Sequence, residues 1–278
     1  MAAGAVAEDS TADASAASKA PAIEIVREPF DAACIRAVAF DAYDTLFDWD
    51  FTATIAEYLA EARIECDHEA FAAYFRKDAF QAVSLWAPGH RAEDGTLDRR
   101  KMLDGPTPEW ISTWEMWRRQ FERTFAQHEV QGDAVQGANR LRDVLAAAPA
   151  FPEAFEAVER LAARGLLVGL MSNADEDFLQ SAVSCNRLRF SVIQSSESLR
   201  VYKPHRASFA ALCGRLGHAT EAVLYVGDSA QTDVLGATHA GLRTAWVHRN
   251  ADAKYPEDIV APDLDVTSLL DVAEALGA

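Results

Sequence analysis

The stretch IRAVAFDAYDTLFD, residues 35–48, joins a short apolar run to an acidic turn and decides the fold class. Its first six residues, 35–40, are of strand type and stop at Asp41. Similar apolar runs recur along the chain, namely LLVGLM at 166–171, AVLYVG at 222–227 and LRTAWVH at 242–248. Runs that are almost continuously apolar suit strands covered on both faces, as in a parallel sheet.

Segments with helical periodicity separate these runs. One helix is expected at 152–165, where Gly165 suits a C-terminal cap. Its apolar face would be formed by Phe155, Val158, Leu161 and Ala162. Further helices are expected at 205–216, 230–240 and 268–276. Because strands and helices alternate, we predict an α/β fold with a doubly wound parallel sheet.

Residues 48–149, between the first two strand-like runs, show helical periodicity rather than strand-like runs. Helical periodicity is present at 52–65, 68–86 and 109–127, with a polar stretch from Pro88 to Pro108. One predicted helix face carries Trp110, Trp114 and Trp117, and we expect these rings to pack rather than to bind a ligand. We predict that 48–149 forms a helical cap over the sheet edge, that 23–47 with 150–278 forms the catalytic core, and that 1–22 is a disordered tail.

Charge and hydropathy narrow the class of function. The 278 residues include 26 Lys and Arg against 43 Asp and Glu, for a formal net charge of −17. We therefore expect no nucleic-acid or membrane partner, because both would require basic surface. No apolar run is long enough to span a bilayer, and residues 1–20 lack the features of a signal peptide. We expect a cytoplasmic monomer or homodimer that acts on a small anionic substrate.

The cysteines lie far apart in the sequence, at Cys34, Cys66, Cys185 and Cys213. Their spacing fits neither a zinc site nor a disulfide framework. We expect buried, reduced thiols.

Polar side chains follow the predicted strands or lie on the loops between them. In chain order they are Asp41 to Thr45, Ser172 with Asn173, Lys203 with Pro204, and Asp228 to Asp233. In open α/β sheets, ligands bind outside the carboxyl ends of the strands. We therefore expect a carboxylate, hydroxyls, a lysine and an acid pair to meet at one edge of the sheet.

In these motifs the sequence resembles the haloacid dehalogenase (HAD) superfamily over residues 34–276. The motifs are D-x-x-x-T-L from Asp41 to Leu46, the serine Ser172, the pair Lys203-Pro204, and GDSAQTDVLGA from Gly227. The long insertion after the first motif matches the family's helical cap in position. The resemblance implies a Rossmann-like core and a hydrolase that forms a covalent aspartyl intermediate.

Physical chemistry agrees with the roles that the resemblance implies. Asp41, at a strand end, is placed to attack as a nucleophile and form an ester or an acyl phosphate. Lys203 offers a positive charge that keeps Asp41 ionised and offsets the charge that develops during attack. Donors for an anionic group of the substrate would come from Thr45, Ser172 and Asn173, although a lone hydroxyl at such a position more often caps a helix or turn.

The acidic residues suggest a metal site. Asp41, Asp228 and Asp233 would repel one another at close range unless a cation or a proton intervenes. A hard divalent ion held by oxygens resolves that repulsion. By the resemblance, Asp41, the Tyr43 backbone carbonyl and Asp228 would hold Mg²⁺, with Asp233 supporting its shell. The alternative is a turn in which Asp228 and Asp233 only cap the following helix.

The residue two positions after the nucleophile bears on the reaction. Phosphatases of the superfamily have an Asp there that protonates the leaving alkoxide, whereas this chain has Tyr43. A phenol with a pKa of about 10 is a poorer acid at neutral pH. Asp44, one position further on, is expected to point elsewhere along the turn. A Tyr at this position is similar to the 2-haloacid dehalogenases, in which halide leaves without a proton.

Residues 73–86, AYFRKDAFQAVSLW, also resemble a dehalogenase segment. Its arginine, which receives halide and substrate carboxylate, would correspond to Arg76, although an exposed helix charge explains Arg76 equally well. Asn173, next to the motif serine, matches the same pattern.

The acidic motif favours the other reaction. Dehalogenases of this type need no metal and generally have a small polar residue where this chain has Asp228. Two further dehalogenase positions also differ, because their Asn and Tyr are here Ala230 and Phe209. We favour hydrolytic dehalogenation of small 2-haloacids, because the residue beside the nucleophile acts directly in the chemistry. The alternatives are a Mg²⁺-dependent phosphatase for a small phosphate ester and a catalytically silent member that binds a ligand through its aromatic-rich cap.

Overall fold

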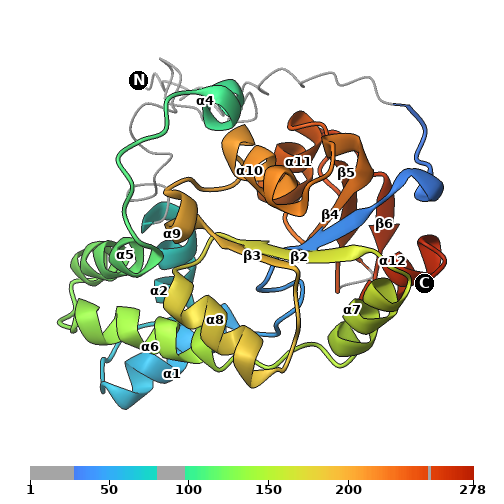
Figure 1. Ribbon diagram of the computed structural model, residues 1–278. Coiled ribbons are helices and arrows are strands. Elements are labelled where there is room, and N and C mark those ends of the chain that lie inside the picture. The colour runs from blue at the N-terminus through green and yellow to red at the C-terminus, as the bar shows by residue number, and fades with distance from the viewer. Residues whose placement is uncertain (1–27, 80–97, 250–251) are drawn as a thin grey trace, which may run out of the picture.

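The computed structural model describes residues 28–79, 98–249 and 252–278. Within these ranges, six parallel strands form one sheet in the order β3-β2-β1-β4-β5-β6 (Figure 1). In chain order they are β1 Ala37–Phe40, β2 Leu167–Ser172, β3 Val192–Ser195, β4 Val223–Gly227, β5 Arg243–Val247 and β6 Leu264–Val266. The predicted α/β class with a parallel sheet is confirmed.

The strand order reverses at β1. β1 pairs with β2 on one side and with β4 on the other, so that Phe40 lies opposite both Leu170 and Val226. Such a reversal point opens a crevice beyond the carboxyl ends of the strands, which is where ligands bind in open α/β sheets. The residue that follows β1 is Asp41.

Helices cover both faces of the sheet (Figure 1). On one face lie α7 Ala154–Ala163, α8 Glu176–Cys185 and α12 Leu269–Ala275, and on the other lie α10 Arg206–Leu216 and α11 Leu235–His239. Successive strand residues point to opposite faces. In β1, Val38 and Phe40 therefore join the first core cluster, whereas Ala37 and Ala39 pack in the second.

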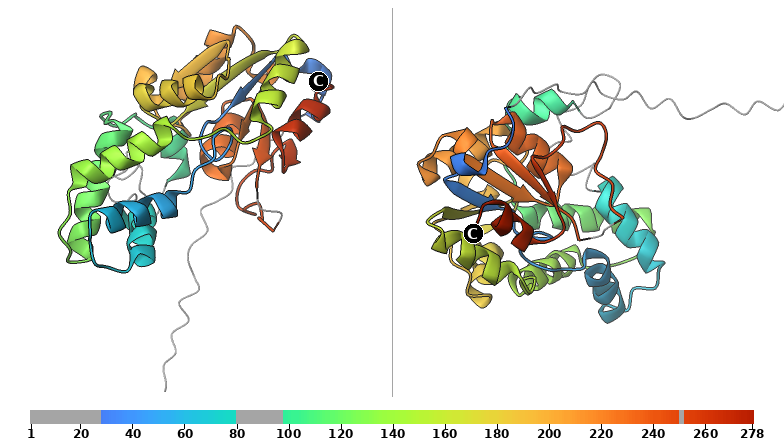
Figure 2. Two further views of the ribbon diagram at one scale, coloured as in Figure 1. Left: turned by 90° about the horizontal axis from the view of Figure 1, so that it is seen from below. Right: turned by 90° about the vertical axis from the view of Figure 1, so that its right-hand side faces the viewer.

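Between β1 and β2 the chain forms further helices. They are α1 Phe51–Glu61, α2 His68–Tyr74, the π-helical turn η2 Phe75–Ala79, α4 Arg99–Asp104, α5 Thr113–Gln127 and α6 Ala134–Ala146. Four of them, α1, α2, α5 and α6, gather beside the sheet (blue-cyan to green in Figure 2). Their shared core is aromatic, with Phe121 in contact with Tyr58, Phe71 and Phe75.

The chain leaves and re-enters the sheet layer at neighbouring points. Phe47 and Ala150 form an antiparallel bridge, and the Asp48 amide donates to the Pro149 carbonyl at 2.8 Å. The predicted boundary between core and cap at 47/48 and 149/150 coincides with this bridge, and the domain division itself stays a prediction. The predicted tail, 1–22, lies outside the described residues.

The start of α5 is tied to the sheet layer by a buried carboxylate. Asp175, which follows β2, accepts from the Thr113 amide at 2.8 Å and from the Trp114 amide at 2.9 Å. The Tyr202 hydroxyl donates to the Ile111 carbonyl at 3.0 Å. The two Asp175 bonds satisfy amides at the helix N-terminus that have no partner within the helix.

The short elements complete the chain. They are the 3₁₀ turns η1 Ala32–Cys34 and η3 Thr220–Ala222, the helix α9 Ser196–Leu199, and the π-helical turn η4 Ala230–Val234, which precedes α11. In the described part of the chain, no helix has both the length and the apolar character needed to cross a membrane.

Some local expectations were wrong. The buried face of α7 is formed by Ala154, Ala157, Val158 and Leu161, whereas Phe155 is 52% exposed. Ala154 and Ala157 thus take part in the buried face, whereas Phe155 and Ala162 lie on the exposed side of the helix. Of the four cysteines only Cys213 is buried, whereas Cys34 and Cys185 are exposed and Cys66 is half-buried. All four are free thiols.

The expected helices of the insertion also need correction. Trp110 is not in α5, because the Ser112 hydroxyl accepts from the Glu115 amide and starts the helix at Thr113. The polar stretch 88–108 contains α4, whose first amides are capped by Asp98. Of the helix expected at 68–86, residues 68–79 form α2 and η2, and the remainder lies outside the described residues.

Candidate active site

Asp41 is fixed where β1 ends. Its amide still donates to the Val226 carbonyl of β4 at 2.8 Å, so the sheet ladder positions its backbone. The side chain extends past the strand into the crevice between β2 and β4, and the residue is 9% exposed. This is the position that nucleophilic attack requires.

Lys203 is the centre of a buried hydrogen-bond network. Its Nζ donates to Asp41 Oδ1 at 2.6 Å, to Asp233 Oδ1 at 2.7 Å and to the Tyr225 hydroxyl at 2.9 Å. These bonds use all three donors of the ammonium group. Burial lowers the pKa of Lys203, but the Asp233 and Asp41 carboxylates outweigh it and hold that pKa well above its ordinary value.

Asn173 holds the loop that carries Lys203. Its Nδ2 donates to the Lys203 carbonyl at 3.0 Å, and its Oδ1 accepts from the Lys203 amide at 2.8 Å. The amide oxygen and one amide proton are therefore engaged with the backbone. Asn173 lines the cavity, and its two hydrogen bonds hold the Lys203 backbone in place.

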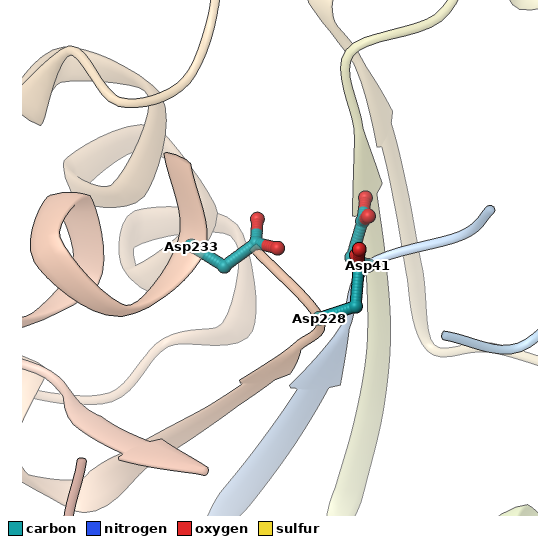
Figure 3. Close-up of side chains that lie close together, drawn as sticks. All are labelled: Asp41, Asp228 and Asp233. Atoms are coloured by element: carbon teal, nitrogen blue, oxygen red, sulfur yellow. The ribbon is translucent and has the colours of Figure 1, made fainter. Parts of the chain in front are cut away.

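Three carboxylates meet beside the lysine. Oxygens of Asp41, Asp228 and Asp233 lie within 4.8 Å of one another, and Figure 3 shows the Asp233 carboxylate directed toward the other two. Burial raises the pKa of Asp228 well above its ordinary value, and the Asp233 and Asp41 carboxylates add to the shift. Burial also raises the pKa of Asp233 to about 6, against the opposing effect of Lys203.

The local backbone is shaped around Asp233. The Ser229 amide donates to Asp233 Oδ2 at 3.0 Å. A Cβ at Gly227, the last residue of β4, would lie 2.4 Å from the Asp233 carboxylate, so a larger residue there would displace Asp233. The Thr45 hydroxyl donates to Asp228 Oδ1 at 3.4 Å, which links the first motif to the last.

The acid cluster suits a cation. Three carboxylates face one ammonium group, and that leaves an excess of negative charge in a largely buried place. Carboxylate oxygens are the ligands that Mg²⁺ prefers. Asp41 and Asp228 therefore fit the predicted metal site, and the Tyr43 carbonyl stays a prediction as its third ligand.

A cavity of about 300 Å³ opens onto Asp41. The predicted site residues in its wall are Asp41, Tyr43, Arg76, Ser172, Asn173 and Lys203. Most of the remaining wall is apolar or aromatic: Trp49, Phe51, Phe75, Met116, Trp117, Leu145 and Phe178. Trp117 thus faces the cavity as well as packing 5.5 Å from Phe178, where the sequence suggested packing alone.

Tyr43 is held away from a proton-donating role. Its ring packs against Phe47 and Phe178, with centroids 5.7 and 6.0 Å apart, and its hydroxyl donates to the Leu145 carbonyl at 3.3 Å. Burial raises the pKa of Tyr43, and the Asp41 carboxylate adds to the effect. A phenol in this setting is a weaker acid than a free one.

The prediction for Asp44 was wrong, because Asp44 lines the cavity. Its backbone has a φ of 62°, and its amide donates to the Phe47 carbonyl at 2.9 Å, which folds the turn back on itself. Its carboxylate accepts from Trp49 Nε1 at 3.3 Å. Burial raises the pKa of Asp44 to about 6. The spacing of the motif gave no sign that Asp44 has a left-handed backbone conformation.

Sequence reasoning also missed residues outside the motifs. Tyr225 lies within a strand-like run and carried no sign that its hydroxyl meets Lys203. Thr113, Gln120 and Tyr202 enter the cavity wall from α5 and the loop after α9. Their presence depends on how α5 packs, which no motif encodes.

Comparisons with known proteins agree with this geometry. A family model described as haloacid dehalogenase-like hydrolase matches residues 35–241. A phosphoserine phosphatase of Thermus thermophilus is 33% identical over 227 residues, which cover 77% of this chain and 86% of that protein. An (S)-2-haloacid dehalogenase of a Pseudomonas species (strain YL) is 28% identical over 255 residues, or 86% of this chain and 94% of that protein.

A solved structure shares the fold. The L-2-haloacid dehalogenase from Xanthobacter autotrophicus, with chloropropionic acid covalently bound, superposes with a TM-score of 0.66 at 21% identity and covers 88% of this chain and 99% of that one. The family model matches most of the chain, including the motif that begins at Asp41 and the motif that begins at Gly227, and the Rossmann-like sheet agrees with this match. The chain belongs to the haloacid dehalogenase-like hydrolases.

Proposed function

We propose that the cavity hydrolyses a small 2-haloacid through a covalent ester on Asp41. The observation that carries the proposal is the environment of Tyr43, where a phosphatase of this superfamily would have its general acid. The Tyr43 hydroxyl is bonded to the Leu145 carbonyl, and burial raises its pKa. A halide ion leaves without a proton, so this reaction has no need of a donor there.

The proposed reaction has two steps. The Asp41 carboxylate attacks C2 of the haloacid, the C2–halogen bond breaks with its electron pair on the halide, and an ester forms. Water then adds to the Asp41 carbonyl carbon, the ester C–O bond breaks, and a 2-hydroxy acid leaves while Asp41 regains its carboxylate. The net reaction releases one proton, and Asp233 is the nearby carboxylate fixed by Lys203 to receive it.

Charge in the wall supports an anionic substrate. Arg76 lines the cavity, with its guanidinium 5.5 Å from the Phe51 ring centroid, and can pair with the substrate carboxylate. Lys203 balances the charge on Asp41. The similarity to the Pseudomonas (S)-2-haloacid dehalogenase supports the same reaction.

A second candidate, a Mg²⁺-dependent phosphatase, is favoured by the acid cluster and by the similarity to the phosphoserine phosphatase. Asp41 and Asp228 would hold the ion, which would supply positive charge to a phosphate group. Lys203 would keep the nucleophile in place. Asp44 is the other carboxylate in the described cavity wall and would be the group nearest a leaving alkoxide.

A paired screen separates the two reactions. Haloacids and phosphate esters are each assayed with Mg²⁺ and with EDTA. Chloride release from 2-chloropropionate that persists in EDTA supports dehalogenation, and no release across a panel of haloacids contradicts it. Phosphate release that EDTA abolishes supports the second candidate.

A further inference from the structure

Gln120 is a buried amide in the cavity wall that the reaction does not use. It lies on α5 and is 2% exposed. Its neighbours in the wall include Phe75, Met116 and Trp117, which are apolar or aromatic. A polar side chain in such surroundings is costly unless its donors and acceptors are satisfied.

Only one end of this amide has a partner. Nε2 donates to the Phe75 carbonyl at 3.2 Å. Because a carbonyl can only accept, this bond fixes the orientation of the amide and leaves Oε1 on the other side. Among the described residues, Oε1 has no hydrogen-bond partner. The wall therefore contains a buried acceptor whose partner has to come from elsewhere.

The cavity also has room for more than the smallest haloacids. Its volume is about 300 Å³. Pockets of about 300 Å³ and above are the range in which drug-sized ligands bind, and a three-carbon acid is much smaller. The anionic end of a substrate would lie beside Arg76 and its reacting carbon beside Asp41, and the aromatic wall suits an apolar body.

We infer that Gln120 selects substrates that carry a hydroxyl or N–H donor on an apolar body, with the donor bonded to Oε1. The inference rests on the proposed function, because it takes the anionic group to lie at the Asp41 end of the cavity. A ligand with a donor gains a hydrogen bond to Oε1, whereas an apolar analogue leaves Oε1 unpaired and binds less tightly. Gln120 is thus a specificity residue that acts on the choice of substrate.

The test measures binding, so that it does not depend on which reaction occurs. Isothermal titration compares four pairs of unreactive acids in which methyl replaces hydroxyl. They are the ortho, meta and para hydroxyphenylpropanoates against their methylphenyl counterparts, and 6-hydroxyhexanoate against heptanoate. We expect at least one hydroxylated acid to bind the wild type about tenfold more tightly than its partner.

Two variants assign the preference. In Gln120→Met the ratio should fall to about one, whereas Gln180→Met, at an exposed glutamine outside the cavity wall, should keep it. If Gln120→Met has a much lower melting temperature than the wild type, Gln120→Leu is used in its place. A preference that survives loss of Gln120, or no preference in any pair, including no binding at all, overturns the inference. Chloride and phosphate release are measured separately on the wild type, so failure of the proposed function is distinguishable.

Discussion

At the scale of single residues, the site is organised by one ammonium group. Lys203 binds Asp41, the proposed nucleophile, at 2.6 Å and Asp233 at 2.7 Å, and its third donor goes to Tyr225. Loss of either partner of a buried ion pair destabilises the folded protein, because the other partner is left as an uncompensated buried charge. The position of Asp41 therefore depends on Lys203 and, through Lys203, on Tyr225 and Asp233.

Replacement of the nucleophile should separate catalysis from folding. We expect Asp41→Asn to lower kcat by at least about 10³-fold on whichever substrate the screen identifies, because an amide cannot form the ester. Steady-state kinetics and a thermal melt measure the two effects. Asp48→Asn, at an exposed residue a few positions away, is the control and should stay active. A fully active Asp41→Asn protein would contradict the proposed role of Asp41 as the nucleophile.

A methyl group at Gly227 should disrupt the acid cluster. In Gly227→Ala the new Cβ meets the Asp233 carboxylate at 2.4 Å, so Asp233 has to move away from Lys203. We expect a loss of about 1–3 kcal/mol in the free energy of unfolding, measured by urea denaturation, and a lower kcat.

Gly214→Ala is the matched control. Gly214 lies inside α10, and a Cβ there has nothing within 4 Å. This variant should gain about 0.5–1 kcal/mol, because alanine is the better helix former. Equal behaviour of the two variants would contradict the packing argument.

At the scale of elements, α5 connects the cavity to the sheet. Its N-terminus is capped by Asp175, which comes from the loop after β2 and makes no cap bond to its own helix, α8. α5 also carries Thr113, Met116 and Gln120 into the cavity wall. The Asp175 contact thus holds the α5 part of the cavity wall to the sheet layer that carries Asp41.

Removal of this cap should weaken both stability and activity. Asp175→Ala leaves the Thr113 and Trp114 amides without partners, and we expect a loss of about 1–2 kcal/mol in the free energy of unfolding. The value of kcat/KM should fall as well, because α5 shifts. Denaturant melts and kinetics test this. Glu122→Ala, which removes an exposed ion pair on α5 itself, should cost less than about 1 kcal/mol.

The elements that the sequence could predict are those with a strong local pattern. The central strands were predictable, because both faces are covered and their apolar runs are continuous. β3 and β6 were missed, since Val192–Ser195 and Leu264–Val266 are short, lie at the sheet edges and mix polar with apolar residues. The motif residues met as expected, whereas Asp44 and Gln120 depended on a left-handed turn and on helix packing.

At the scale of the whole molecule, the charge is unevenly balanced. The formal net charge is −17, and the acid cluster concentrates three carboxylates in one largely buried place. Cations in general stabilise such a protein by screening, whereas an ion bound at the cluster stabilises it by mass action. The two effects differ in their dependence on concentration and on Asp228.

Magnesium should therefore raise the melting temperature beyond the effect of salt. At about 100 times its dissociation constant, Mg²⁺ bound only to the folded state contributes about 2.7 kcal/mol, or a shift of about 5–10 °C. NaCl at equal ionic strength is the control. In Asp228→Asn the excess shift should disappear. A shift that NaCl reproduces in full would argue against a bound ion.

The bridge between Phe47 and Ala150 brings together the two ends of the segment predicted to form the cap. Since the chain leaves and returns at neighbouring points, a change in the length of the segment between them adds little loop-closure cost, provided that the Asp175 bonds to α5 are kept. The exchanged segment would carry Phe51, Phe75 and Gln120, whereas Asp41, Lys203 and Asp233 would stay behind. A change of sequence within this one segment would therefore change which substrates fit the cavity, while the residues around Lys203 stay the same.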